Sequence, residues 1–306
     1  MNKDSDTYSA SGEVASVLEK RTFWTRVAID LKKSPWTARI GIMIIFLYAM
    51  VAVFAPLIAP YGQSEIFPTP YAPWSADFIF GTDQIGRDTF SRMIYGARNT
   101  VGIAVATTCL AFLIGGVLGL AAAIDRSYFD QALSRLVDVL MAIPSLIFAL
   151  VLLSIFGSTI INLIIIIAVL DSTRVFRLTR AVAINVVVMD YVEAARLRGE
   201  GLGWIMRKEI LPNIMPPLIA EFGLRFCFVF LSIAALSFLG VGIQPPNADW
   251  GSMVRENANM MIYAQFDPNV VLRPLLPASA IAFLTVAINF VVDWLLNKTS
   301  GLHDEH

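Results

Sequence analysis

The chain has 306 residues, of which 57% are hydrophobic and 15% charged, and its formal net charge is -1. Its mean hydropathy of +0.67 is well above that of a soluble domain, so the composition predicts an integral membrane protein. The lysines and arginines form no basic block, so nucleic acid is not indicated as a partner.

Cysteine and histidine give no sign of a metal centre or a disulfide framework. Cys109 and Cys227 both fall inside apolar runs, where small buried hydrophobic side chains are expected. His303 and His306 lie among the last four residues, where solvated side chains are typical. We therefore predict that the chain carries no catalytic, metal-binding or cofactor-binding residues.

Apolar runs predict six membrane-spanning helices and an all-α integral membrane fold. A hydrocarbon core of about 30 Å needs ~20 apolar residues per helix. The runs that meet this length lie near residues 40–59, 100–124, 134–156, 160–179, 218–243 and 275–296. The fourth is the weakest, because its apolar stretch gives way at Asp171 to a segment rich in arginine. We expect that helix to leave the membrane there.

The spans divide the chain into an N-terminal tail (1–39), a first span with a long loop (40–99), a five-span core (100–297) and a C-terminal tail (298–306). Of the 23 lysines and arginines, 17 lie in the two tails and in the segments 125–135 and 174–212. Because cytoplasmic segments carry the excess of basic residues, both termini and these two segments are predicted to be cytoplasmic. The loops at 60–99 and 244–274 then face outward.

The segment near 180–217 holds the most charged stretch between two predicted spans, YVEAARLRGEGLGWIMRKEILPN (191–213). Residues 180–198 are predicted to form one helix, and residues 204–211 a second short helix that ends at Pro212. Between them lies a turn supplied by three glycines, Gly199, Gly201 and Gly203. From the residues alone, this unit fits an interfacial helix with Trp204 as its lipid anchor and with Arg207 and Lys208 on headgroups.

The same stretch resembles the EAA loop of ABC importer permeases, in which EAA, a glycine and a final LP stand at fixed spacing. In that family the loop carries a short coupling helix that docks in a groove of the cytoplasmic ATPase. The resemblance implies an ATPase-coupling role for ten residues: Glu193, Ala194, Ala195, Gly199, Gly201, Leu202, Gly203, Trp204, Leu211 and Pro212. Arg198 and Glu209 depart from the family pattern, which commonly has leucine at the first position and isoleucine or histidine at the second.

Three further segments are similar to the C-type subunit of the dipeptide, oligopeptide and nickel importers, namely FGTDQIGRDTFSRMIYGAR (80–98), RLVDVLMAIPSLIFAL (135–150) and ALSFLGVGIQPPNADWGSM (235–253). The ending INFVVDWLLNKTSGL departs from the family's usual NLLGDGLRD. The outer-loop motif comprises Gly81, Thr82, Asp83, Gly86, Arg87 and Asp88. We expect it to fold the outer loop rather than to contact a substrate-binding protein, with Thr82 or Asp83 capping a short helix and Asp83 pairing with Arg87 at i, i+4.

Two i, i+4 pairs of polar residues fall inside predicted spans, Glu221 with Arg225 and Asn289 with Asp293. Charge inside a bilayer is costly, so these residues should face the protein interior, a partner subunit or an aqueous path. We interpret Glu221 and Arg225 as a structural pair.

The resemblance implies a six-span permease subunit (MetI-like fold) of an ATP-driven importer in the cell inner membrane. It also implies a second homologous permease subunit, two ABC ATPase subunits or domains that use ATP and Mg, and an extracytoplasmic substrate-binding protein. None of the six lysines follows a glycine, so the chain lacks the P-loop needed to hydrolyse ATP itself. A secondary carrier and a non-transporting membrane scaffold or sensor remain as alternatives. The substrate, whether peptide, opine, glycoside or nickel, is left open.

Overall fold

The computed structural model describes residues 34–124, 128–263, 265 and 268–299. Most of the N-terminal tail and most of the C-terminal tail, with His303 and His306, lie outside the described residues. Within the described ranges the chain forms helices and loops, and the β-type pairing found there is an isolated bridge between Thr82 and Asp88. The predicted all-α fold is confirmed.

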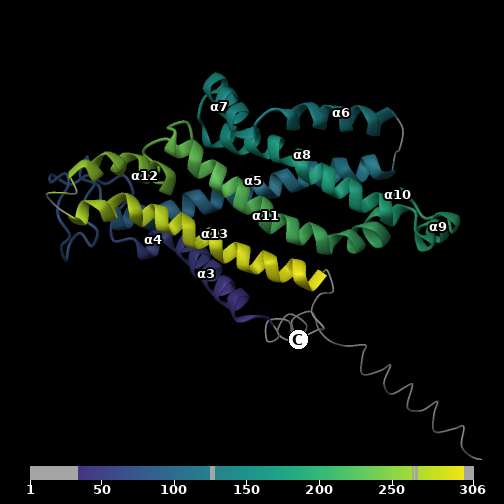
Figure 1. The fold of residues 1–306 in the computed structure, drawn as a ribbon, viewed down its shortest axis with the longest axis horizontal. Coiled ribbons are helices and arrows are strands. Elements are labelled where there is room, and N and C mark those ends of the chain that lie inside the picture. Colours follow the sequence, from purple (N-terminus) through teal and green to yellow (C-terminus); the bar gives the residue numbers. More distant parts are fainter. Residues whose placement is uncertain (1–33, 125–127, 264, 266–267, 300–306) are drawn as a thin grey trace, which may run out of the picture.

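The long helices lie side by side in an elongated bundle (Figure 1). Their bounds are α3 (Trp36–Val53), α4 (Ala55–Ile58), α5 (Thr89–Ile124), α6 (Tyr128–Ala142), α7 (Ser145–Phe156), α8 (Ile160–Val187), α9 (Asp190–Leu197), α10 (Leu202–Ile205), a π-helical turn η1 (Met206–Ile210), α11 (Leu211–Phe238), α12 (Trp250–Ala258), two 3-10 turns η2 (Asn259–Tyr263) and η3 (Pro268–Val271), and α13 (Leu272–Thr299).

Four helical runs among the described residues are long and apolar enough to cross a membrane. They are α3, α5, the continuous run Leu202–Phe238 and α13. The bent pair of α6 and α7 adds a fifth if it is counted as one span. α8 is not among them, because Asp171, Arg174 and Arg177 bring charge into its apolar part. Six spans therefore stay a prediction.

The predicted third span (134–156) is broken, which corrects the expectation of a single helix over these residues. α6 ends at Ala142, α7 begins at Ser145, and the two helices meet at 90°. Pro144 explains the break, because proline lacks an amide hydrogen and disfavours helical backbone at the residue before it. Its carbonyl then starts the next helix by accepting a hydrogen bond from the Phe148 amide at 3.0 Å.

Helices α5 and α8 lie side by side, and two glycines allow their backbones to approach closely. A Cβ atom placed on Gly115 would lie 2.7 Å from the Val175 Cβ atom, and one on Gly119 would lie 2.8 Å from the Thr179 Cβ atom. These distances are shorter than van der Waals contact, so the pairing of α5 with α8 requires glycine at both positions.

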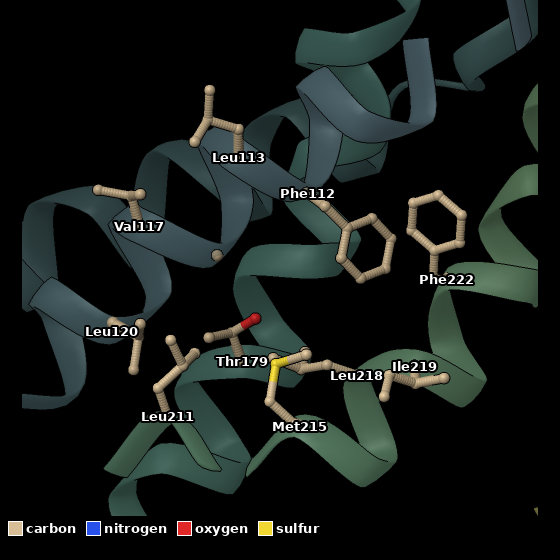
Figure 2. A pocket seen from close by; sticks show the side chains of 11 residues that line it. Phe112, Leu113, Val117, Leu120, Thr179, Leu211, Met215, Leu218, Ile219 and Phe222 are labelled. Atoms are coloured by element: carbon tan, nitrogen blue, oxygen red, sulfur yellow. The ribbon is translucent and has the colours of Figure 1, made fainter. Parts of the chain in front are cut away.

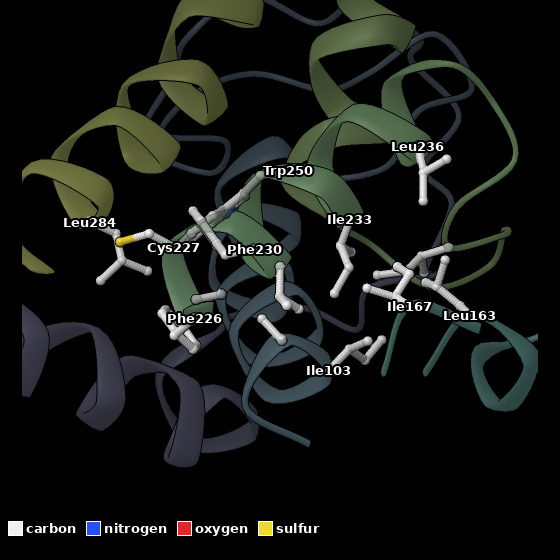
Figure 3. Close-up of a cluster of buried hydrophobic side chains, with 14 of the residues drawn as sticks. Ile103, Leu163, Ile167, Phe226, Cys227, Phe230, Ile233, Leu236, Trp250 and Leu284 are labelled. Atoms are coloured by element: carbon white, nitrogen blue, oxygen red, sulfur yellow. The ribbon is translucent and has the colours of Figure 1, made fainter. Parts of the chain in front are cut away.

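The main hydrophobic core lies where α11 crosses α5, α8, α12 and α13 (Figure 3). Phe230, Ile233 and Leu236 of α11 are completely buried there, and Trp250 from the start of α12 packs edge-on against Phe230. Cys227 is buried in this core as predicted. Cys109 is exposed on α5, which corrects the expectation that both cysteines are buried.

Candidate functional site

The two sequence motifs lie at opposite ends of the bundle. Helices α9 and α10, which carry the EAA-like residues, are at one end, and α12 with the long loop before α5 is at the other (Figure 1). The long helices run between these ends. This arrangement is the one expected if the two motifs face opposite sides of a membrane.

The first part of the EAA-like segment is a separate short helix, which corrects the prediction of one helix over 180–198. α8 ends at Val187, and Met189 adopts an extended conformation (φ -76°, ψ 144°) as the N-cap of α9. The break follows a run of valines, whose β-branched side chains are restricted in a helix. It allows α9 to fold back so that Val192 and Ala195 become completely buried.

Gly199 ends α9 in a left-handed backbone conformation with φ +81°. The Gly199 amide donates to the Arg196 carbonyl at 2.9 Å, and the Glu200 amide donates to the Ala195 carbonyl at 3.2 Å. These two bonds form a Schellman motif, the helix ending that glycine favours at this position. The predicted turn at Gly199 is therefore present, whereas Gly201 is an extended N-cap and Gly203 lies inside α10.

Pro212 does not end the second helix, which corrects the sequence-based boundary. The chain passes from α10 through the π-helical turn η1 into α11, and Pro212 lies in the first turn of α11. Proline is tolerated there, because amides in the first turn of a helix need no intrahelical acceptor. The Asn213 side chain donates to the Glu209 carbonyl at 2.6 Å and so satisfies a backbone group at the junction.

One face of the segment is packed against the bundle and the other is open. Ala195 belongs to a buried cluster with Val192, Ile205 and Ile210, which contacts the neighbouring ends of α5 and α8. Leu211 is half-buried. The remaining eight candidate residues are exposed: Glu193, Ala194, Gly199, Gly201, Leu202, Gly203, Trp204 and Pro212.

The open face is apolar as well as exposed. Leu197 has 83% of its surface exposed and Leu202 has 59%, and Trp204 in the same segment is more than one-third exposed. Leu197 was not among the candidate residues. An apolar residue just before the glycine turn, on the hydrophilic face of α9, is a sequence signal that could have identified it as exposed. Large apolar side chains exposed together mark contact surfaces for proteins or membranes.

Arg198 and Glu209, the two departures from the family pattern, lie next to each other. The Arg198 Nη2 atom is 4.0 Å from the Glu209 Oε1 atom, which links the end of α9 to η1. A partly exposed pair at this distance contributes about 0–1 kcal/mol. Arg198 and Glu209, the two residues that depart from the family pattern, are thus charge partners of each other.

An apolar groove begins beside Leu211 and runs between α5 and α11 (Figure 2). Its volume is about 400 Å³, and its walls include Phe112 and Leu120 of α5 and Met215 and Phe222 of α11. The groove is continuous with the end of the bundle that carries the EAA-like segment.

The outer-loop motif is buried in a network of four charges. Asp83 pairs with Arg87 at 2.6 Å, as the i, i+4 spacing predicted, and with Arg92 at 3.4 Å. Both arginines also contact Glu256 of α12, at 3.2 Å from Arg87 and 3.0 Å from Arg92. Burial raises the pKa of Glu256 above its ordinary value, against the opposing effect of Arg87. The network holds the loop against α12, as expected for a folding role.

Helix capping in this motif differs from the prediction. Residues 81–88 form no helix, and Asp88, not Thr82 or Asp83, caps α5 by accepting from the Ser91 amide at 2.7 Å. Thr82 is completely buried, and its hydroxyl donates to the Thr69 carbonyl at 2.7 Å.

Gly81 and Gly86 have φ values of +71° and +90°. A Cβ atom on either would collide with a backbone carbonyl, that of Ala72 or of Phe67 respectively. Arg273, which the sequence motif does not include, donates to the Thr82 carbonyl at 2.7 Å. These contacts fold the outer loop into one compact unit.

Comparison with protein families matches residues 115–298, more than half of the chain, to the binding-protein-dependent transport system inner membrane component. The chain belongs to this family. Residues 22–75 match a second family, the N-terminal transmembrane domain of oligopeptide transport permease C. The resemblance to the C-type subunit is therefore confirmed.

Similar proteins are permeases of peptide transport systems. The di/tripeptide transport system permease protein DppC of Pseudomonas aeruginosa is 36% identical, over 83% of this chain and 84% of its own length. The dipeptide transport system permease protein DppC of Escherichia coli is 36% identical, over 84% and 86%. That of Alkalihalophilus pseudofirmus is 32% identical, over 89% and 88%. The chain thus aligns with these permeases over most of both lengths.

Proposed function

We propose that this chain is one permease subunit of an ATP-driven importer and that the exposed face of α9 and α10 couples it to the ATPase. The observation that carries the proposal is the open surface around Leu197, Leu202 and Trp204, held by a rigid glycine turn at the end of the bundle. A docking ATPase would cover these apolar side chains. The basic side chains around them, Arg196, Arg207 and Lys208, would meet acidic groups at its rim.

The assembly we propose contains a second homologous permease subunit, two ABC ATPase subunits or domains and an extracytoplasmic binding protein. ATP and Mg would be used by the ATPases, because this chain has no P-loop. The permease relatives support this composition through their family. Their names also favour a di- or oligopeptide as the solute. A secondary carrier or a scaffold would leave the α9–α10 face without a partner ATPase.

We also propose that the chain lies in the inner membrane with both termini and α9–α10 in the cytoplasm. The proposal rests on the excess of basic residues in these segments. Cysteines introduced at Gln63 and at Glu200 test it, since these residues lie near opposite ends of the bundle. An impermeant thiol reagent added outside the cell should label the first and not the second. The reverse labelling would refute both the orientation and the coupling role.

The proposed set of subunits is tested by purifying the chain from cells that express it together with its neighbouring transport genes. We expect it to carry an ATPase and a second permease with it, and ATP hydrolysis should rise when the loaded binding protein is added. A chain that purifies alone and transports solute without ATP would identify a secondary carrier. The variant Trp204→Ala, made with Leu202→Ala, should release the ATPase while leaving the two permeases together.

A further inference from the structure

Three charged side chains meet deep inside the helix bundle. Arg225 of α11 lies 2.7 Å from Glu221 on the same helix and 3.6 Å from Asp171 on α8. The exposed fractions of these side chains are 10% for Arg225, 12% for Asp171 and 19% for Glu221. The predicted pair of Glu221 with Arg225 is therefore present, and Asp171 is a third member that the local spacing did not reveal.

The cluster is level with the uncharged part of the neighbouring helix α5. Ser172, next to Asp171, touches Gly115 of α5 through its carbonyl. Gly115 lies near the centre of the stretch 99–124, which contains no charged residue. Charges at such depth are costly in lipid and characteristically line a solute path or a partner interface.

Hydrogen bonding leaves atoms of this cluster unsatisfied. The carboxylates of Asp171 and Glu221 share the Arg225 guanidinium, and Arg174 supplies a second positive charge near Asp171. The Asp171 Oδ2 atom is buried and accepts no hydrogen bond from any group in the described part of the chain. Arg174 is exposed one turn further along α8, and its guanidinium lies 6.0 Å from the centre of the Phe228 ring. A negative side chain, Asp171, and a positive one, Arg174, therefore lie one helical turn apart on α8.

Two small cavities adjoin these residues, each with a volume of about 30 Å³. Asp171 lines the first, together with Ser145 and Ser232. Arg174 lines the second, together with Ser145 and Thr173. A cavity needs about 10–15 Å³ to hold a water molecule, so each could hold one group of the size of an ammonium or part of a carboxylate.

Both cavities lie at the break between α6 and α7, since Ser145 is the first residue of α7 and lines both. Non-helical backbone at membrane depth is tolerated where it is buried in protein or borders a water-filled space. Discontinuous helices are also the elements from which transporters build solute sites near the middle of the bilayer. The break, the orphaned carboxylate oxygen and the two polar cavities therefore occur together.

We propose that this region is a solute-contact site on the translocation path, with Asp171 receiving a protonated amine and Arg174 receiving a carboxylate. The proposal rests on the proposed function of the chain as a permease subunit, and it deepens that function by assigning the charge recognition to named residues. Ser145 lines both cavities, so its hydroxyl is available to either group. The ligand class is a small zwitterionic solute with a free amine and a free carboxylate.

The test uses single cysteines in the complete complex, reconstituted with its ATPases, after Cys109, Cys227 and the cysteines of the partners have been replaced. Ser232→Cys reports on the first cavity and Thr173→Cys on the second. Each is reacted with a cationic aminoethyl thiosulfonate and with an anionic sulfonatoethyl thiosulfonate. Ile233→Cys is the matched control, because Ile233 is completely buried beside Ser232.

We expect Ser232→Cys to react on the order of tenfold faster with the cationic reagent and Thr173→Cys on the order of tenfold faster with the anionic one, because one nearby charge attracts or repels the reagent. Asp171→Asn should abolish the first preference and Asp171→Glu should retain it. Arg174→Gln should abolish the second. Ile233→Cys should react with neither reagent.

Equal rates with both reagents, no reaction at either cysteine, or preferences that survive both charge removals would overturn the proposal. If Asp171→Asn fails to assemble, the Arg174→Gln arm still decides, because Arg174 is exposed. Stimulation of ATP hydrolysis by the binding protein is measured on the same preparation. Its absence in the parent complex would refute the proposed function, whereas its presence with unreactive cysteines would refute only this site.

Discussion

Replacing Gly199 by valine should uncouple ATP hydrolysis from transport while leaving the helices assembled. Gly199 has φ +81°, and no atom lies within 4 Å of the position that its Cβ atom would take. The added side chain therefore meets no steric clash, and the penalty comes from the backbone conformation alone. For a residue other than glycine this conformation costs about 1–3 kcal/mol, with a β-branched residue such as valine at the upper end.

A penalty of about 1–3 kcal/mol changes a local equilibrium by a factor of roughly 5–150, and valine lies toward the larger factor. In Gly199→Val the Schellman ending would therefore be replaced in much of the population by a different chain path. Leu202 and Trp204 would then no longer be presented together. We expect binding-protein-stimulated ATP hydrolysis to fall by a similar factor, and transport with it, because coupling between two sites is reciprocal.

Two control variants separate backbone conformation from side-chain bulk. Gly199→Asn should retain most of the coupling, since asparagine tolerates left-handed backbone better than other residues. Gly102→Ala should be neutral, because Gly102 lies in α5, outside the α9–α10 face, with nothing within 4 Å of its Cβ position. The assay is stimulated ATPase activity of the reconstituted complex at equal assembly. Full stimulation in assembled Gly199→Val would show that the turn does not set the coupling surface.

Other predictions concern stability. Gly115→Val should lower the free energy of unfolding by about 1–3 kcal/mol through overpacking against α8. Gly116→Val should not lower it, because the Cβ position of Gly116 is open. Thermal unfolding of the two variants in detergent compares them, and equal losses of stability would contradict the packing argument. Arg92→Met should cost about 3–5 kcal/mol by leaving one buried negative charge uncompensated, because Arg87 alone then remains to pair with Asp83 and Glu256, while the exposed control Arg255→Met should cost little. Because the pKa of Glu256 is raised, the stability from its protonation is present below its ordinary pKa and lost as pH rises through the raised value. The Arg92→Met deficit should therefore be smaller at pH 5 than at pH 8, and a deficit independent of pH would refute this.

Local sequence patterns predicted the features that depend on local chemistry. The apolar runs located the long helices, and the glycine after Arg198 located the end of α9, because helix length and left-handed turns are encoded by neighbouring residues. Asp83 and Arg87 pair as their spacing suggested. Pro144 is a local signal as well, and it could have revealed the break of the third span.

Features that depend on distant residues could not be predicted in this way. The break before α9 serves the burial of Val192 and Ala195 against other helices, and nothing in residues 185–190 specifies that partner surface. Arg92 and Glu256 pair across 164 positions of sequence. The i, i+4 spacing gave Arg225 one partner but could not supply Asp171 from another helix.

The absence of a helix end at Pro212 has a mechanical consequence. Because α10, η1 and α11 form one run of 37 residues, the run measures about 55 Å along its axis at 1.5 Å per residue, with bends favoured at η1 and at Pro216 and Pro217. A tilt of about 5° around its midpoint would displace each end by roughly 2.4 Å at that length. Leu202 lies at one end of this lever, Arg225 lies near its middle, and Phe238 is at the far end. A push at Leu202 would therefore move Phe238 in the opposite direction, while Arg225 near the middle would be displaced far less.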